Sequence, residues 1–345
     1  MRKLARFATF VTCAATLTAP LIGSAQTQEV SERIRQVGAD LGFQEPDIDR
    51  LTQGEIVGRD LKEDSKKELA LAVAMVVKAP FGEVSDWIAK GTIDKVDETI
   101  LSHGEIPDGA VSAESFAGLE LAPAELDKLL KAEAGADFNL SQPEIENLQA
   151  IAKANASAPV AKQREAIAQG YREVLAGRTN AYRKTGLAGI APFTRGGEEA
   201  HPGKELSLAI GEMKFVEEGA PTFYRAFKSF PADASATGKS SFTWQVQSIQ
   251  ERPTAILVHR LFEKHEDFAV GGRREYFVGQ SFNSLQLIAG AFPFGEDTLI
   301  FYTNRTFTDQ VAGFGSGTKH TVGRKMMLGE VVKLFESIRA SFQAE

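Results

Sequence analysis

The chain has 345 residues, 25% of them charged, with a formal net charge of −7 and one cysteine. Because its basic residues are scattered among acids, the sequence argues against nucleic acid and against a strongly anionic membrane surface as partners. A lone thiol forms no intramolecular disulfide or thiolate metal cluster, so a hydrophobic core must stabilise the fold. We expect no metal and no cofactor, because the acidic residues around His201 lack metal-ligand spacing and no cofactor motif is present.

The first 25 residues have the pattern of a signal peptide. Basic residues precede an apolar stretch at 7–22, and the small residues 23–25 provide a cleavage site for a signal peptidase. An uncleaved anchor is the alternative, but threonine and proline interrupt the apolar run, which is shorter than the roughly 20 residues that cross a bilayer. We therefore predict a periplasmic or secreted protein with no stable transmembrane anchor after cleavage.

A polar N-terminal segment, 26–60, is predicted to be helical from about 30 to 51. The main domain, 61–345, begins with ELALAVAMVVKAP at 68–80, where large apolar residues alternate mostly with alanine. This period of two predicts a strand with one bulky face and one small face, and the small face allows a covering element to approach closely. Pro80 then begins a short helix with its apolar residues on one side.

The middle of the chain is predicted to be mainly helical. Extended segments at 98–106 and 116–121 precede a helical insertion at about 122–232. Within the insertion, Ser141 and Glu144 have the spacing of a capping box ahead of an apolar periodic run. The insertion therefore separates the first strand of the domain from its last strands.

From residue 241 the composition changes to β-branched and aromatic residues separated by turns. This pattern predicts four antiparallel strands, at 242–249, 254–262, 274–292 and 298–306. The third is unusually long, and its glycines provide places where it can bend. An amphipathic helix at 322–342 follows. These elements predict an α+β fold, in which a curved antiparallel sheet wraps around a long C-terminal helix and carries a helical insertion.

Several segments resemble a known group of folds. VVKAPFGEVSDWI at 76–88 and the last strands with the last helix resemble the two ends of the START-like, or helix-grip, superfamily, which includes polyketide cyclase and lipid transport domains. GADFNLSQPEIENL, APTFYRAFKSFP and TLIFYTNRT resemble segments of an uncharacterised group of exported bacterial proteins. The resemblance covers most of residues 60–342 and implies a helix-grip-like fold, from which the helical insertion departs.

The candidate site consists of residues in the last strands. Their polar members alternate with large apolar residues, so some of them must point inward. A buried polar group without a partner costs roughly 1–3 kcal/mol, so such groups need a network, a water or a ligand. We expect a mostly apolar pocket in which a few polar groups orient a ligand and the C-terminal helix supplies apolar surface. The candidate ligand-binding residues are His259, Gln280, Asn283, Leu285, Leu287, Tyr302 and Arg305.

The leading hypothesis is non-catalytic binding of a small apolar or amphipathic, lipid-like molecule, with no residue assigned a catalytic role. The first alternative is a cavity enzyme of cyclase or hydrolase type that uses His259 and Arg305. It predicts a carboxylate next to His259, whereas a carrier predicts apolar surroundings. The second alternative is an envelope protein–protein interaction module that docks through the helical insertion. It predicts a filled interior and an exposed apolar patch.

Overall fold

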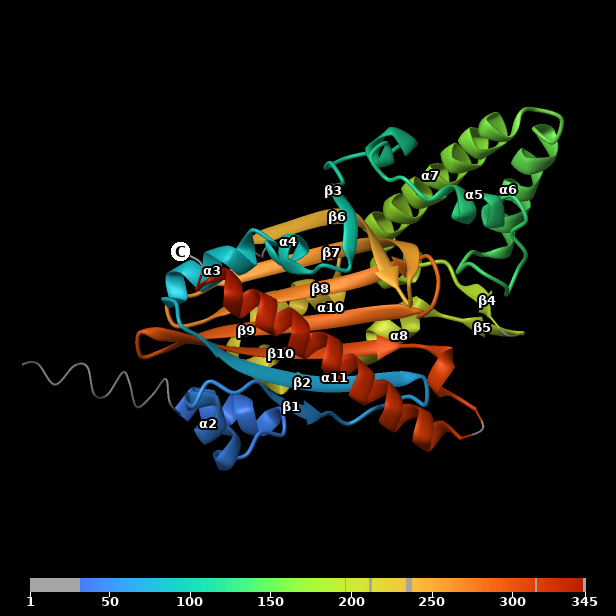
Figure 1. The fold of residues 1–345 in the computed structure, drawn as a ribbon. Helices are drawn as coiled ribbons and strands as arrows, with labels where there is room; N and C mark the ends of the chain where they lie inside the picture. The colour runs from blue at the N-terminus through green and yellow to red at the C-terminus, as the bar shows by residue number, and fades with distance from the viewer. Residues whose placement is uncertain (1–31, 196, 211–212, 234–237, 314, 344–345) are drawn as a thin grey trace, which may run out of the picture.

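The computed structural model describes residues 32–195, 197–210, 213–233, 238–313 and 315–343. Its centre is a curved eight-stranded antiparallel sheet in the order β1-β2-β10-β9-β8-β7-β6-β3, with helices on both faces (Figure 1). A long C-terminal helix, α11 (Ser316–Ser341), crosses one face obliquely (Figure 1). The predicted α+β fold, with a curved antiparallel sheet and a long last helix, is confirmed.

The strands of the sheet come from both ends of the chain. They are β1 (Val57–Asp60), β2 (Glu68–Val77), β3 (Ile100–Glu105), β6 (Lys239–Ile249), β7 (Arg252–Lys264), β8 (Ala269–Val278), β9 (Ser284–Phe294) and β10 (Asp297–Phe307). β2 pairs with β10 along its whole length, from Val77 opposite Thr298 to Glu68 opposite Phe307. β2 has the bulky face and the alanine face that its alternation predicted. The bulky face packs toward α11, and the alanine face packs toward the other side.

The predicted long third strand is wrong. The chain turns at Gly279–Asn283, so the region contains the two antiparallel neighbours β8 and β9, and five strands follow residue 238. Ser281 adopts a left-handed conformation in this turn, with φ of 76°. Gly279 donates its amide hydrogen to the carbonyl of Ala255, and a Cβ at this glycine would lie 3.1 Å from that oxygen. Because the turn lacks proline and an Asn-Gly pair, its apolar flanks look continuous in the sequence.

Three helices cover the first face of the sheet: α11, α3 (Phe81–Ala89) and α4 (Ile93–Val96). α11 buries Val331, Phe335 and Ile338 against the bulky face of β2 and β10. It begins at Ser316 rather than at the predicted residue 322. The sequence did not indicate this start, because residues 316–321 are glycine and polar residues that show no apolar period. The last part of the helix reaches α3, where the rings of Trp87 and Phe342 lie 5.7 Å apart.

The opposite face is covered by short helices. These are a helix at 32–40, α2 (Glu45–Thr52), α8 (Pro202–Ala209), α9 (Lys214–Gly219) and α10 (Pro221–Ser229). Phe223 and Phe227 of α10 stack with centroids 5.6 Å apart and press on Gly272 of β8, where a Cβ would lie 2.9 Å from one ring. Helix in the N-terminal segment ends at Thr52, close to the predicted end at about residue 51, and the segment finishes in strand β1 at the sheet edge.

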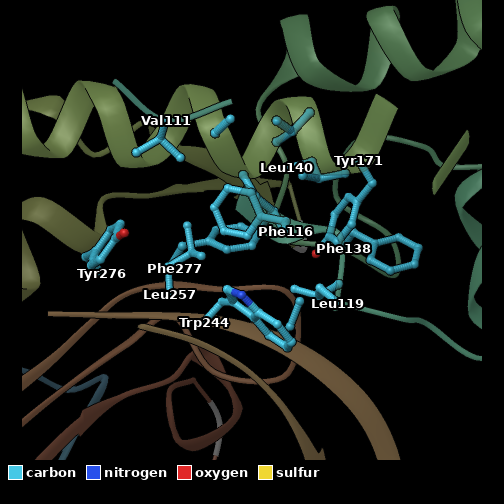
Figure 2. Packing of buried hydrophobic residues seen from close by; sticks show 14 of the residues in the cluster. Val111, Phe116, Leu119, Phe138, Leu140, Tyr171, Trp244, Leu257, Tyr276 and Phe277 are labelled. Carbon is cyan, nitrogen blue, oxygen red and sulfur yellow. The ribbon is translucent and has the colours of Figure 1, made fainter. Parts of the chain in front are cut away.

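The first part of the helical insertion packs over the end of the sheet formed by β6, β7 and β8. The helices of this first part of the insertion are α5 (Pro123–Leu129), α6 (Gln142–Ala154) and α7 (Val160–Thr185), followed by η2 (Gly186–Gly189) and the hairpin of β4 (Phe193–Arg195) and β5 (Glu198–Ala200); α8, α9 and α10 form its remainder. The predicted capping box at Ser141 and Glu144 is present. Figure 2 shows the dense core beneath α7, where Tyr171 and Phe116 pack above Trp244 and Phe277 of the sheet.

The extended segment predicted at 116–121 is wrong. The chain forms a short 3-10 helix, η1 (Ala113–Phe116), and then a turn and an irregular segment. Phe116 and Leu119, three residues apart, both enter the core in Figure 2. That spacing belongs to a helical turn rather than to an alternating strand. The remaining short element, η4 (Asp309–Val311), connects β10 to the segment before α11.

Candidate functional site

A cavity of about 160 Å³ lies between the sheet and the helices α3 and α11. We call it the α11 cavity. Its apolar wall combines side chains from both ends of the chain: Met75, Trp87, Leu287, Ile300, Phe335 and Ile338. The interior expected between the last strands and the last helix therefore contains space that the protein's own side chains do not fill.

One side of the α11 cavity is polar. Lys239, Ser241 and Thr243 line it from β6, and because they are two residues apart they share one face of that strand. Lys239 is exposed and donates a hydrogen bond of 2.9 Å to the carbonyl of Ala89, at the end of α3. Thr243 is only 7% exposed, and its hydroxyl meets no hydrogen-bond partner within the described part of the chain. Donors therefore extend from the rim of the cavity to its interior.

Two arginines in the wall are compensated by buried carboxylates. Arg273 donates to Asp94 at 3.2 Å and to Glu275 at 2.8 Å, and Arg260 also donates to Asp94. Burial alone would raise the pKa of Asp94, but the two guanidinium groups hold that pKa below its ordinary value. Burial raises the pKa of Glu275 despite Arg273. The charge of this pair of arginines is therefore balanced inside the protein.

Two of the predicted ligand-binding residues, Leu287 and Tyr302, line the α11 cavity. The Tyr302 ring packs edge-on against Phe335 with centroids 5.4 Å apart. Its oxygen accepts a hydrogen bond of 3.1 Å from Asn304, and burial raises the pKa of Tyr302 to about 12. The phenol is therefore neutral near pH 7. Leu285 is half-buried and lies outside the cavity lining.

Arg305 is not at the α11 cavity. It points to the opposite face of β10, where it forms an ion pair of 2.5 Å with Glu68, which is fully buried. Its parity along the strand differs from that of Tyr302, so the two residues lie on opposite faces. A buried ion pair of this kind holds β10 to the neighbouring strand β2, and it leaves the Arg305 guanidinium occupied.

Gln280 and Asn283 also bind partners within the protein. Both belong to the turn between β8 and β9. Gln280 donates to Thr254 at 2.6 Å and accepts from Arg252 at 2.9 Å. Asn283 donates to Glu205 of α8 at 2.8 Å. The protein itself therefore supplies partners for both ends of the Gln280 amide and for the Asn283 amide nitrogen, whereas Asn283 Oδ1 has no partner among the described residues.

His259 lies on the opposite face of β7, buried among aromatic rings. It stacks on Phe242 with centroids 4.4 Å apart, and it hydrogen bonds to Tyr182 through Nδ1 at 3.0 Å and to Ser240 through Nε2 at 3.1 Å. Burial, together with Arg274 and another arginine nearby, holds the pKa of His259 well below its ordinary value. Within the described chain, no hydrogen bond or ion pair joins this imidazole to a carboxylate.

The hydrogen bonds around His259 define its tautomer. Arg274 donates to the Tyr182 oxygen at 3.0 Å, so the phenol hydrogen finds its acceptor at His259 Nδ1. Nε2 then carries the remaining hydrogen and donates it to the oxygen of Ser240. In this arrangement the imidazole cannot accept a proton from Ser240, so the pair is not set up as a nucleophile and its base.

A second cavity, of about 200 Å³, lies on the opposite face between the helix at 32–40, α9 and the ends of β8 and β9. Its walls include Val37, Val216 and Phe292, with Arg33 and Glu218 among its polar residues. None of the predicted ligand-binding residues lines it. Across the described ranges, no three His, Cys, Asp or Glu side chains are placed to share a metal ion.

Sequence reasoning missed the polar wall of β6. The signal was the alternation of Lys239, Ser241 and Thr243 with Phe242 and Trp244. Such a pattern is typical of a strand with one solvent-exposed face, so the polar residues attract no attention until a helix is found to cover them. Missing the turn between β8 and β9 had a similar effect, because it left open which strands border the C-terminal helix.

No helix in the described part of the chain is both long enough and apolar enough to cross a membrane. Comparisons with known proteins found no matching protein-family model, no matching curated protein and no matching solved structure.

Proposed function

We propose that this protein binds a small apolar or amphipathic molecule in the α11 cavity and does not transform it. The observation that carries the proposal is a cavity of about 160 Å³, open at one side and bordered largely by apolar side chains of the sheet, α3 and α11. An engineered apolar cavity of roughly 150 Å³ in another protein accepts benzene, so a ring or a short acyl chain fits the space. Burying about 100 Å² of apolar ligand surface there contributes about 2.5 kcal/mol to binding.

We extend the proposal to a START-like, helix-grip architecture and to an exported protein. The curved sheet that borders α11, with ligand space between them, supports the first part. The second part rests on the signal-peptide pattern at 1–25, which lies outside the described residues. N-terminal sequencing of the protein from its own envelope fraction is expected to begin at Gln26. A mature chain that still begins at Met1 would contradict export by this signal.

The surroundings of His259 favour binding over catalysis. The enzyme alternative needs His259 and Arg305 in one cavity with a carboxylate beside the imidazole. Instead, His259 lies among aromatic rings on β7 as a neutral hydrogen-bond donor. Arg305 lies on β10 and forms an ion pair with Glu68 of the neighbouring strand β2. The interaction-module alternative needs a filled interior, and the α11 cavity argues against it.

Native mass spectrometry of protein purified from its own host tests the proposal. We expect a co-purifying small apolar or amphipathic mass that is released on unfolding. Ala289→Phe, which places a ring in the α11 cavity, is expected to abolish the adduct, because Ala289 lines that cavity. Ala117→Phe, at an exposed position away from it, is the matched control and should retain the adduct. Retention of the adduct by Ala289→Phe, with a normal circular dichroism spectrum, would place the ligand elsewhere.

A further inference from the structure

We propose that the ligand of the α11 cavity is an amphiphile with a carboxylate head group. The head group is held by the β6 residues Ser241 and Thr243 beside the ammonium of Lys239, and the tail lies against the apolar wall under α11. This inference rests on the proposed function and specifies its ligand class.

β6 has unused hydrogen-bonding capacity at the α11 cavity. Thr243 is 93% buried, since only 7% of it is exposed, and its hydroxyl lacks a partner among the described residues. A buried unsatisfied hydroxyl costs roughly 1–3 kcal/mol, so a site that retains one gains when a ligand atom pairs with it. Thr243 lines the α11 cavity, so a ligand there lies beside its side chain. Because the hydroxyl oxygen is closed to solvent, the side chain turns toward the ligand when the two pair.

The separation of Ser241 and Thr243 suits a carboxylate. Ser241 and Thr243 lie two residues apart on one strand face, so their Cα atoms are separated by about 7 Å. A carboxylate that accepts one hydrogen bond through each oxygen bridges two hydroxyl groups at roughly this separation. Lys239, two residues further toward the rim, has three ammonium donors and uses one of them on the carbonyl of Ala89. Its remaining donors and its charge are available to the same head group.

The opening of the α11 cavity carries excess positive charge. Lys239 and Lys90 are exposed lining residues, and Glu105 is the acidic residue among the lining. The arginines deeper in the wall are balanced by Asp94 and Glu275, so they neither add to nor cancel this charge. An opening with excess positive charge attracts an anionic head group and repels an amine.

The lining of the α11 cavity changes from polar to apolar across the sheet, and this change sets the direction of the ligand's tail. From β6 the lining continues across the sheet to Leu287, Ile300 and Met75, under Phe335 and Ile338 of α11. The cavity is therefore polar and cationic at the β6 end and apolar at the β10 end. A fatty or aryl-alkyl carboxylate places its head group at the polar end and extends its tail toward the apolar end, whereas an apolar molecule without a head group leaves the Thr243 hydroxyl unsatisfied.

Three ligands of equal chain length test the head group: octanoate, 1-octanol and octylamine. Trp87 lines the cavity and reports binding by its fluorescence. The only other tryptophan, Trp244, lies in the core under α7, and Trp244→Phe removes its signal. Calorimetry on the unmodified chain gives the same dissociation constants if that variant does not fold. We expect octanoate to bind at least about fivefold more tightly than octanol, and octylamine to bind most weakly.

Two variants assign the selectivity to β6. Lys239→Gln is expected to raise the dissociation constant for octanoate about threefold to fivefold and to leave that for octanol unchanged. Thr243→Val is expected to weaken octanoate binding by a similar factor. Lys264→Gln is the matched control, because Lys264 also bridges to α3, through Asp86 at 2.8 Å, but does not line the cavity. It should leave octanoate binding unchanged.

The outcomes separate this inference from the proposed function. Equal binding of octanoate and octanol, or tighter binding of octylamine, would overturn the carboxylate assignment and leave a carrier of apolar molecules standing. Unchanged octanoate binding in Lys239→Gln would overturn the role of β6. Failure of all three ligands to bind a correctly folded, ligand-stripped protein would remove the carrier itself.

Discussion

The two faces of β6 and β7 meet different surroundings. On the face under α7 and α10, His259 is surrounded by rings and bonded to Tyr182 and Ser240 (Figure 2 shows the neighbouring core). On the face toward α3 and α11, Lys239 and Thr243 have spare hydrogen-bonding capacity beside a cavity of about 160 Å³. One pair of strands therefore borders a packed core on the face under α7 and α10 and a cavity on the face toward α3 and α11, because different helices cover the two faces.

The covering helices explain the difference. α7 contributes Tyr182, whose ring stacks on Tyr276 at 4.2 Å and fills the space above β8. α11 crosses the sheet obliquely and packs against β2 and β10, so the part of the sheet near β6 is covered by the short helices α3 and α4 (Figure 1). The chain leaves α3 at Gly91, which has a positive φ of 65° and lies close to Arg260. Short helices leave the interior beside β6 open.

The largest expected loss of stability comes from removing a ring from the packed face of the sheet under α7. Tyr182→Ala removes a fully buried ring and the acceptor of the Arg274 hydrogen bond. We expect it to lower the free energy of unfolding by about 3–5 kcal/mol in urea denaturation. Tyr182→Phe keeps the ring and should cost about 1–2 kcal/mol, which separates the packing from the hydroxyl. A loss below about 1 kcal/mol for the alanine variant would show that this face is not the rigid core we infer.

The second effect uses pH to test the burial of His259. Its pKa is about 6.5 when unfolded and well below that in the folded protein, so below about pH 6.5 the unfolded state binds a proton that the folded state does not. The free energy of unfolding should therefore fall as the pH drops, by at most about 2 kcal/mol between pH 7 and pH 5 from this group. We expect His259→Phe to lose this contribution, measured as the difference from wild type. Parallel curves for the two proteins would contradict it.

The third effect compares two threonines. Thr179 on α7 bonds to the Leu175 carbonyl and to Tyr276, at 2.9 and 3.1 Å, whereas the Thr243 hydroxyl lacks a partner in the described chain. Thr179→Val should cost about 1 kcal/mol, and Thr243→Val should stabilise the ligand-free protein or leave its stability unchanged. Thermal unfolding of the two variants measures the contrast. A comparable loss in both would mean that Thr243 is satisfied in solution.

The smallest expected change in stability comes from substituting Lys239 at the rim of the α11 cavity. Lys239 is exposed, and among the described residues it donates one hydrogen bond, to the carbonyl of Ala89. Lys239→Gln should change the free energy of unfolding by less than about 0.5 kcal/mol. Urea denaturation of the variant checks this, and it ensures that any loss of octanoate affinity reflects the lost ammonium rather than a damaged fold. A loss above about 1 kcal/mol would make Lys239 a structural residue.

The candidate site was predicted only in part, and particular residues show why. Leu287 and Tyr302 line the cavity, and both lie in strands that the sequence identifies. Arg305 is in the same strand as Tyr302, yet its buried partner Glu68 is 237 residues away along the chain. The sequence predicts that Gln280 lies inside a long strand, because Gly279 indicates a bend and no Asn-Gly pair or proline indicates a turn. A partner so far away in the chain produces no pattern in the sequence around the residue. The sequence therefore does not distinguish a buried polar group that binds a ligand from one that binds another residue of the protein.

The amino-acid sequence alone determined the local elements: the alternation in β2, the capped start of α6 and the amphipathic last helix. These depend on periods of two or 3.6 residues and on caps, which involve neighbours in the chain. Only the tertiary structure decided that α7 fills one face of β6 and that α3 and α11 leave space on the other. Alternation divides the side chains of a strand between two faces, but contacts between segments far apart in the chain decide what each face meets.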